Sequence, residues 1–354
     1  MREGNTVMSA HLNRRAFGLL AGAAAAGIVC PRTVRAAPSG QIVVGTWGGD
    51  YQNLLQQNVA VPLMTPMGVN VVYDTATDTV RKTKLMAERR LPRGSMDVAA
   101  LTASGSFEMY SNGALEELDE GKVPNLQHVQ PFLKSKYAAP HIYTGRVILY
   151  NPKLIPEKPT SYADLWKPEY AGKVGLIDLQ YQTTIESAAM IAGGSMTNYE
   201  PGKAKLLELK KRGVKIYPTN EAMAQALKTE ECAICIMWLA RGVAWQKAGI
   251  PVEIAYPKEG VVLYISDMVV PKNARNKDAA FAYLNAILEP TSQEAFARTM
   301  GYAPTVDNVT LAPALAKQVS LPADLQSSFA KQDQDYLLKT DASLQEWWTK
   351  EFKS

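Results

Sequence analysis

Cysteine and histidine are scarce in this chain of 354 residues. Three cysteines are too few for a disulfide scaffold. Only His128 and His141 follow residue 37, which leaves little material for a histidine-based metal site or a catalytic triad. The same part of the chain has no glycine-rich nucleotide loop and no apolar run of the ~20 residues that a membrane span needs. We therefore predict no cofactor, no metal site and no catalytic residue.

An excess of charge of one sign is also absent. The formal net charge of +4 arises within residues 1–37, so residues 38–354 carry 33 basic and 33 acidic side chains. Proteins that bind nucleic acid need a basic surface. The charge count therefore argues against a nucleic-acid partner.

Two of the cysteines form a C-x-x-C motif, Cys232 to Cys235, inside an apolar strand pattern. Residues three apart on a strand face opposite sides of the sheet. This placement favours two buried thiols over a redox pair or half of a metal site.

Residues 1–37 read as an export signal. Arg14 and Arg15 precede a run of small apolar residues over 21–29, and residues 34–37 (VRAA) resemble a cleavage site. The paired arginines favour twin-arginine export, with a Sec signal as the alternative. Cys30 is disfavoured as a lipid anchor because Val29 stands where a small residue is needed. We expect a soluble mature protein, residues 38–354, outside the cytoplasm.

Short apolar runs alternate with helical patterns along the rest of the chain. Strands are predicted at 42–46, 69–73, 97–101, 146–152, 173–178, 214–217, 233–238 and 261–270. This alternation is typical of an α/β fold with parallel sheets covered by helices. Ligands of such sheets lie beyond the carboxyl ends of the strands, here the loops at 47–51, 74–78 and 102–106. The length indicates two domains.

Four stretches carry a resemblance to a known family. They are residues 45–51 (GTWGGDY), 161–174 (SYADLWKPEYAGKV), 256–260 (YPKEG) and 270–277 (VPKNARNK). The third and fourth are specific in combination, and the four together span nearly the whole chain after residue 37. On these residues the chain resembles the periplasmic solute-binding proteins of ABC importers, in the spermidine/putrescine-binding group.

The resemblance implies a type II periplasmic-binding-protein fold, with two lobes and a ligand cleft between them. Each lobe is expected to be a mainly parallel sheet flanked by helices. We assign residues 38–142 and 264–310 to the first lobe and residues 143–263 and 311–354 to the second, with extended crossings near 141–146 and 260–270. The resemblance also implies no catalysis. We expect a periplasmic monomer whose partners are a small organic solute and the inner-membrane permease subunits.

A polyamine site combines acids for the ammonium groups with aromatic faces that attract cations and pack methylene groups. By the resemblance, Trp47 and Tyr51 match aromatics of the family's first loop, and Trp238 matches a ligand-stacking tryptophan. Tyr264 stands where the family has another tryptophan. The alternative for each is an aromatic of the core or cleft wall without ligand contact.

The acids match the family less closely. Asp178 ends a strand where the family has an acidic cluster, and it is either a ligand acid or a helix N-cap. The family's amine-binding aspartate falls at Ser266, with Asp267 adjacent, and a one-residue offset turns a strand side chain to the other face. The loop around Ser104 lacks the family's tyrosine, and its small polar residues at a helix start suit an anion.

Arg146 follows the crossing at Tyr143 and Thr144, and we place Tyr143 and Arg146 among the candidate ligand-binding residues. An arginine that points into the cleft opposes a dication and suits a carboxylate, and its alternative role is an interlobe salt bridge. The sequence thus predicts a receptor for a small amine-bearing, polyamine-like solute. A receptor for an amino-carboxylate, such as an ω-amino acid or an opine-like compound, is the alternative. A ferric-ion carrier and a secreted enzyme are less favoured.

Overall fold

The computed structural model describes residues 39–354. The predicted export signal, with its paired arginines and cleavage site, lies outside these residues. Within them, strands and helices alternate along the chain as the sequence predicts.

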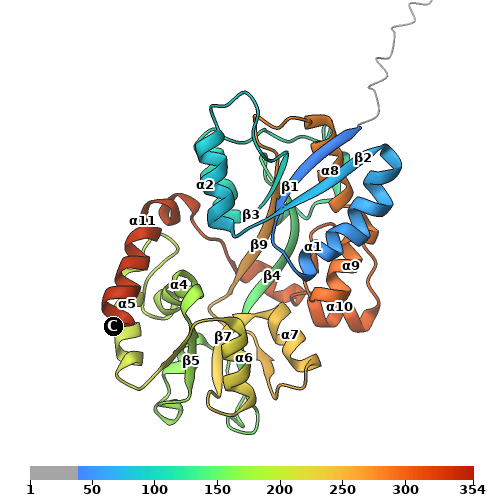
Figure 1. The fold of residues 1–354 in the computed structure, drawn as a ribbon. Coiled ribbons are helices and arrows are strands. Elements are labelled where there is room, and N and C mark those ends of the chain that lie inside the picture. The colour runs from blue at the N-terminus through green and yellow to red at the C-terminus, as the bar shows by residue number, and fades with distance from the viewer. Residues whose placement is uncertain (1–38) are drawn as a thin grey trace, which may run out of the picture. The chain divides into compact units, whose positions relative to one another are not determined.

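The strands join into one sheet whose main path has the order β2-β1-β3-β9-β4-β7-β5-β6. Figure 1 shows this path from the blue strands β1 and β2, through β9 and β4, to β7 and β5. Three short strands lie off the path, of which β8 and β10 pair with β4 and β11 pairs with β9. The strands are β1 Gly40–Thr46, β2 Val69–Thr75, β3 Val98–Thr102, β4 Ala139–Tyr150, β5 Val174–Ile177, β6 Lys215–Tyr217, β7 Ile234–Trp238, β8 Glu253–Ala255, β9 Val261–Val269, β10 Ala303–Pro304 and β11 Phe329–Ala330.

Both parallel and antiparallel pairs occur in the sheet. β1 pairs in parallel with β2 and β3, and β5 pairs in parallel with β6 and β7. The two long strands β4 and β9 run antiparallel to each other, and each runs antiparallel to its outer neighbour, β7 or β3. The predicted parallel sheets are therefore found at the outer strands, and the two central strands are antiparallel.

β4 changes its neighbour partway along its length. Its residues 139–145 pair with β9, and its residues 146–150 pair with β7. The register shifts between Pro140 and Ile142, where the proline has no N–H to give to the ladder. β4 thereby links the sheet around β1, β2, β3 and β9, here called the first half, to the sheet around β5, β6 and β7, here called the second half.

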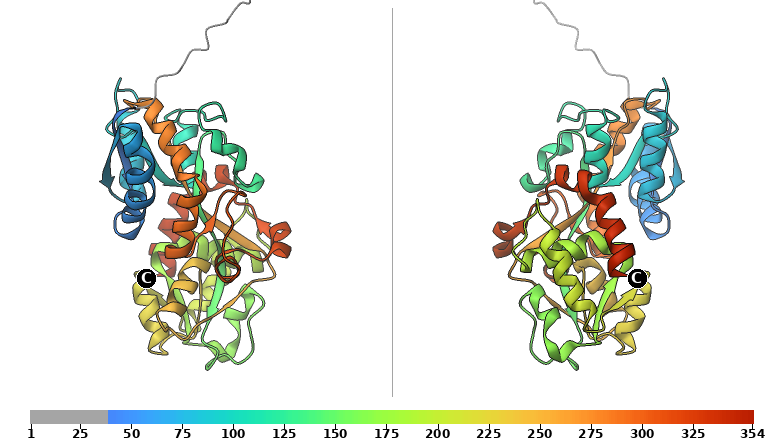
Figure 2. Two further views of the ribbon diagram at one scale, coloured as in Figure 1. Left: turned by 90° about the vertical axis from the view of Figure 1, so that its right-hand side faces the viewer. Right: turned by 90° about the vertical axis from the view of Figure 1, so that its left-hand side faces the viewer.

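Helices cover both halves. α2 lies on one side of β1 and β3, with α8 and α9 on the other, and α4 to α7 surround the second half (Figure 1). The last helix, red in Figure 2, returns to contact both α3 and α4. The helices are α1 Asp50–Leu55, α2 Asp78–Glu88, α3 Ala103–Ser111, α4 Tyr181–Ile191, α5 Glu200–Lys210, α6 Asn220–Lys228, α7 Leu239–Lys247, α8 Lys277–Ile287, α9 Pro290–Met300, α10 Pro313–Val319 and α11 Gln334–Trp347. None of the helices described is long and apolar enough to cross a membrane.

The helical segment that follows β1 is not one uniform α-helix. It begins as α1 and continues as a π-helical segment, Gln56–Met64, and a 3-10 turn, Thr65–Met67. Pro62 lies inside the π-helical segment and has no N–H for the regular ladder. Gly68, at φ +78°, then ends the helix in the left-handed region that glycine adopts without strain.

His141, Cys232 and Cys235 are all buried. The Tyr51 hydroxyl lies 2.7 Å from His141 Nδ1, and burial lowers the pKa of His141 to about 3, so its ring stays neutral. Both cysteines are free thiols whose pKa burial raises, and their burial confirms the prediction of two buried thiols. No cluster of three or more metal-ligating side chains occurs within residues 39–354.

Candidate functional site

The carboxyl ends of the strands and the starts of several helices border a pocket of about 590 Å³, here called the cleft pocket. The first half supplies α2, α3 and β9, and the second half supplies the segment before α4, the start of α6 and the end of β7. α11 adds a further wall. The residues that line the pocket are Asp78, Thr79, Lys82, Thr102, Ala103, Ser104, Glu108, Arg146, Leu179, Gln180, Tyr181, Gln182, Thr183, Asn220, Trp238, Leu263, Tyr264, Ile265, Gln332, Gln334, Leu337, Leu338, Asp341 and Ala342.

Several helix N-termini therefore point toward this pocket. The first residues of α2, α3, α4 and α6 line it, and Trp238 is the N-cap of α7. A helix start carries partial positive charge and free N–H groups. Thr77, Thr102 and Thr219 cap α2, α3 and α6 with their hydroxyls. α4 has no side-chain cap and follows directly on the 3-10 turn Asp178–Gln180.

Arg146 is the charged group at the centre of the site. It stands on β4 opposite Trp238 of β7, and its side chain is fully buried although it borders the pocket. Nη1 donates to the Thr183 carbonyl oxygen at 2.7 Å and contacts Glu186 Oε1 at 3.2 Å. Nε and Nη2 have no hydrogen-bond partner among the described residues. An unmet buried donor costs roughly 1–3 kcal/mol.

Glu186 neutralises this arginine. Its Oε1 faces Arg146, and its Oε2 accepts from the Tyr199 hydroxyl at 2.9 Å and from Gln332 Nε2 at 2.5 Å. Burial raises the pKa of Tyr199, so its hydroxyl keeps the proton it donates. Both residues of the ion pair fall within the segment predicted as the second lobe. Under those predicted lobe bounds the pair joins two elements of one lobe, and the role of Arg146 stays a prediction.

An aromatic wall lies beside Arg146. The Trp238 ring is 5.2 Å from the guanidinium carbon, and the Trp238 and Tyr264 ring centroids are 5.3 Å apart. Burial raises the pKa of Tyr264, which keeps its phenol neutral. The structure thus places the predicted Trp238, Tyr264, Arg146 and Ser104 on one pocket.

The first-loop aromatics do not line the cleft pocket. Trp47 packs edge-on against Tyr51 at 5.2 Å and stacks on the guanidinium of Arg81 at 4.4 Å. Tyr51 is buried beneath it against His141 and Phe296. Ligand contact by Trp47 and Tyr51 remains a prediction.

The acids predicted from β9 and from the end of β5 also lie outside the cleft pocket. Asp178 accepts from Trp348 Nε1 at 2.8 Å and pairs with Lys353 Nζ at 2.5 Å, so the C-terminal residues occupy its carboxylate. Ser266 and Asp267 are buried in β9 and are not among the lining residues. Burial raises the pKa of Asp267 to about 7. Their roles as ligand residues stay predictions.

The acids that do line the pocket were not singled out from the sequence. Glu108 is paired with Lys82 at 2.6 Å. Asp78 accepts from the Thr102 backbone N–H at 3.0 Å, and Asp341 accepts from the Tyr181 hydroxyl at 2.8 Å. Asp78 and Asp341 form no direct ion pair within the described part of the chain, and Arg81 interacts with Asp78 only electrostatically. Asp78 was foreseeable because it ends one of the three strand-end loops, whereas nothing in the sequence places Asp341 there.

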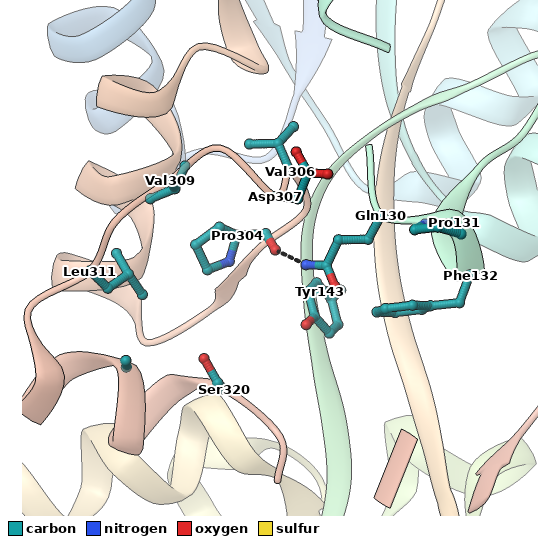
Figure 3. A pocket seen from close by; sticks show the side chains of 11 residues that line it. Gln130, Pro131, Phe132, Tyr143, Pro304, Val306, Asp307, Val309, Leu311 and Ser320 are labelled. Carbon is teal, nitrogen blue, oxygen red and sulfur yellow. Dashed lines mark hydrogen bonds between the residues drawn. The ribbon is translucent and has the colours of Figure 1, made fainter. Parts of the chain in front are cut away.

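A second pocket, of about 600 Å³, lies against the first part of β4 and the segment after β10 (Figure 3). Gln130 Nε2 donates to the Pro304 carbonyl oxygen at 2.7 Å, and Asp307 lies 3.4 Å from His128. The predicted site residue Tyr143 belongs to this pocket and not to the cleft pocket. Gln130 and Asp307 of this second pocket already have partners, whereas two acids of the cleft pocket form no direct ion pair within the described residues. This difference favours the cleft pocket as the functional site.

Comparison with known proteins agrees with this architecture. The family model of the bacterial extracellular solute-binding proteins matches residues 64–323. The spermidine/putrescine-binding periplasmic protein of Salmonella typhimurium is 27% identical over 297 residues, which cover 80% of this chain and 84% of that protein.

Two solved structures share the fold. An ABC transporter structure from Clostridium perfringens has a TM-score of 0.76 at 24% identity and covers 87% of this chain and 98% of its own. A GABA receptor structure has a TM-score of 0.77 at 24% identity and covers 88% of this chain and 97% of its own. These matches confirm the predicted fold class and the resemblance carried by the four sequence stretches. The chain belongs to the bacterial extracellular solute-binding protein family.

Proposed function

We propose that the protein is the periplasmic substrate-binding receptor of an ABC importer and that it captures a small amine-bearing organic solute in the cleft pocket. It delivers the solute to the membrane permease subunits, acts as a monomer and performs no catalysis. Export of the folded protein through the twin-arginine signal belongs to the same proposal.

The observation that carries the proposal is the pairing of an aromatic wall with unpaired acids in one pocket. Trp238 and Tyr264 offer ring faces, and Asp78 and Asp341 offer carboxylates that form no direct ion pair within the described residues. An ammonium group that leaves water needs such charges and faces. The names of the relatives, which bind spermidine and putrescine, support an amine as cargo.

Capture works through closure of two lobes. We propose residues 38–142 with 264–310 as one lobe and residues 143–263 with 311–354 as the other, with β4 and β9 as the crossings between them. A solute that touches Asp78 on one side and Trp238 on the other makes both contacts only when the lobes are together. Binding then shifts the population toward the closed form, and the permease recognises that form.

The test is solute binding by the Trp238→Ala variant. The purified protein is unfolded and refolded to release bound solute, and its melting temperature is measured with putrescine, spermidine and ω-amino acids. Loss of the indole removes a cation–π contact and methylene packing, together about 2 kcal/mol, so Kd for the best ligand rises roughly 30-fold. Phe132→Ala, which truncates an exposed aromatic of the second pocket, is the matched control and leaves Kd unchanged.

Two results would contradict the proposal. If no amine-bearing compound raises the melting temperature, the cargo belongs to another chemical class. If Trp238→Ala binds like the unmodified protein while Phe132→Ala does not, the solute occupies the second pocket instead.

A further inference from the structure

We infer that the solute carries a carboxylate as well as an amine, and that the free edge of Arg146 binds that carboxylate. The inference rests on the proposed function and narrows it from amine-bearing solutes in general to amino-carboxylates. It departs from the polyamine cargo that the relatives' names indicate.

The first argument is the way in which the guanidinium is held. All three protein acceptors of Arg146 gather on Nη1: the Thr183 carbonyl oxygen, Glu186 Oε1 and Ser187 Oγ at 3.0 Å. The N–H of Nε and the nearer N–H of Nη2 point the same way and form the side of the guanidinium that matches the two oxygens of a carboxylate. These are the two nitrogens without a partner.

The protein residue best placed to meet that edge is already engaged. Glu186 Oε1 contacts Arg146 Nη1, and Glu186 Oε2 accepts hydrogen bonds from Tyr199 and Gln332. Glu186 therefore orients the arginine without covering its free side. The side chain of Arg146 is fully buried and borders the pocket, and we place the acceptor for its free edge on the solute that fills the pocket.

The field around Arg146 also favours an anion. The first turn of α4, an eleven-residue helix, lines the same pocket and has no side-chain cap. The positive end of its dipole adds to the arginine's attraction for a carboxylate. A second ammonium group at this position would meet a like charge and leave the arginine edge unsatisfied, which counts against a plain diamine.

The two pocket acids that form no direct ion pair within the described residues, Asp78 and Asp341, supply the other end of the site. Asp78 lies on α2 and Asp341 on α11, whereas Arg146 lies on β4. An amine held by these carboxylates and a carboxylate held by Arg146 place opposite charges at the two ends of one solute. The ring of Trp238, which contacts both Arg146 and Tyr264, packs the chain that joins them. The ligand class is an amino acid whose amine and carboxylate are separated along a carbon chain.

The experiment compares matched ligands on the refolded protein by titration calorimetry. Each ω-amino acid of three to six carbons is paired with the diamine of similar length, for example 4-aminobutanoate with putrescine. We expect at least one amino acid to bind 10-fold or more tightly than its diamine. Butanoate tests a carboxylate without an amine, and 3-aminopropylphosphonate tests a tetrahedral anion.

The variant Arg146→Lys keeps the positive charge beside Glu186 and removes the two-pronged edge. We expect it to weaken the amino acid about 10- to 100-fold and to leave diamine affinity unchanged. Arg298→Lys, an exposed i,i+4 pair with Glu294, is the matched control and changes neither. Far-UV circular dichroism and the melting temperature confirm that both variants fold.

The outcomes separate the inference from the function on which it rests. Diamines that bind while amino acids do not, or tighter binding of the phosphonate, would overturn the inference and leave an amine receptor standing. Butanoate that binds as well as 4-aminobutanoate would overturn the amine cargo and keep the arginine subsite. An amino acid that binds equally well to Arg146→Lys would show that its carboxylate lies elsewhere.

Discussion

Replacing Glu186 with glutamine tests the buried ion pair that supports the site. Both side chains of the Arg146–Glu186 pair are fully buried, so the charge left on Arg146 would have no solvent to stabilise it. Removing one partner of such a pair costs roughly 3–5 kcal/mol. For a chain of this size each kcal/mol lowers the melting temperature by about 2 °C. We therefore expect Glu186→Gln to melt about 6–10 °C below the unmodified protein.

The same variant is expected to respond more strongly to ligand, although it is less stable without ligand. Without Glu186, a solute carboxylate becomes the main counter-ion of Arg146. The rise in melting temperature that an amino-carboxylate causes is therefore larger in Glu186→Gln than in the unmodified protein. Urea unfolding with and without ligand measures both terms under one set of conditions.

The controls decide whether the reasoning about burial holds. Glu346→Gln breaks an exposed i,i+4 pair with Lys350 and is expected to change stability little, because solvent screens the pair. Replacing both members of the buried pair, Arg146→Met with Glu186→Leu, removes both charges and is expected to restore stability while binding is lost. A Glu186→Gln protein as stable as Glu346→Gln would refute the claim that burial makes this pair costly to break. A smaller ligand effect in Glu186→Gln would refute the counter-ion argument.

Two further predictions concern stability alone. Burial raises the pKa of Asp267 to about 7, so the folded state holds a proton that the unfolded state releases near pH 4. This contribution to stability is present below pH 4 and is lost as the pH rises toward 7, on the order of 4 kcal/mol in total. Asp267→Asn should abolish that loss in unfolding experiments between pH 4 and 8. Gly202→Ala should destabilise the protein by about 3 kcal/mol in urea unfolding, because the added Cβ would lie 2.4 Å from the Ile185 carbonyl oxygen of α4. Gly48→Ala, whose Cβ would have no atom nearer than 3.8 Å, should change stability little. Equal effects of the two variants would contradict the packing argument.

The fold was largely predictable because its strands are short apolar runs with helices between them. Each predicted strand before residue 140 lies within a residue or two of an observed one, as for β2 at Val69–Thr75. The start of β4 was not predictable, since Pro140 interrupts the pattern and the strand tolerates it only through a register shift. The antiparallel pairing of β4 and β9 likewise depends on contacts between residues more than 100 positions apart.

The site was predictable where it depends on local position along a strand or helix. Trp238 ends β7 and Ser104 begins α3, so the alternation of strands and helices places both at the pocket. Asp178 sits at a strand end too, but the C-terminal residues Trp348 and Lys353 occupy it. Asp341 reaches the pocket because α11 folds back across α3 and α4. A local sequence pattern does not predict contacts between segments that are this far apart in the chain.

The change of partner along β4 has a mechanical consequence. Gly145 is the last residue of β4 that pairs with β9, and Arg146 is the first that pairs with β7. When two bodies rotate about a shared strand, atoms near the axis hardly move, whereas atoms far from it sweep long arcs. In the proposed hinge, Arg146 lies at the pivot on β4. It therefore contacts the end group of the solute in the open and closed forms alike. If the lobes close as proposed, Asp78 on α2 of the first lobe moves relative to Arg146, whereas Asp341 on α11 belongs to the same lobe as Arg146. The arc of Asp78 then sets how long a solute the closed cleft accepts.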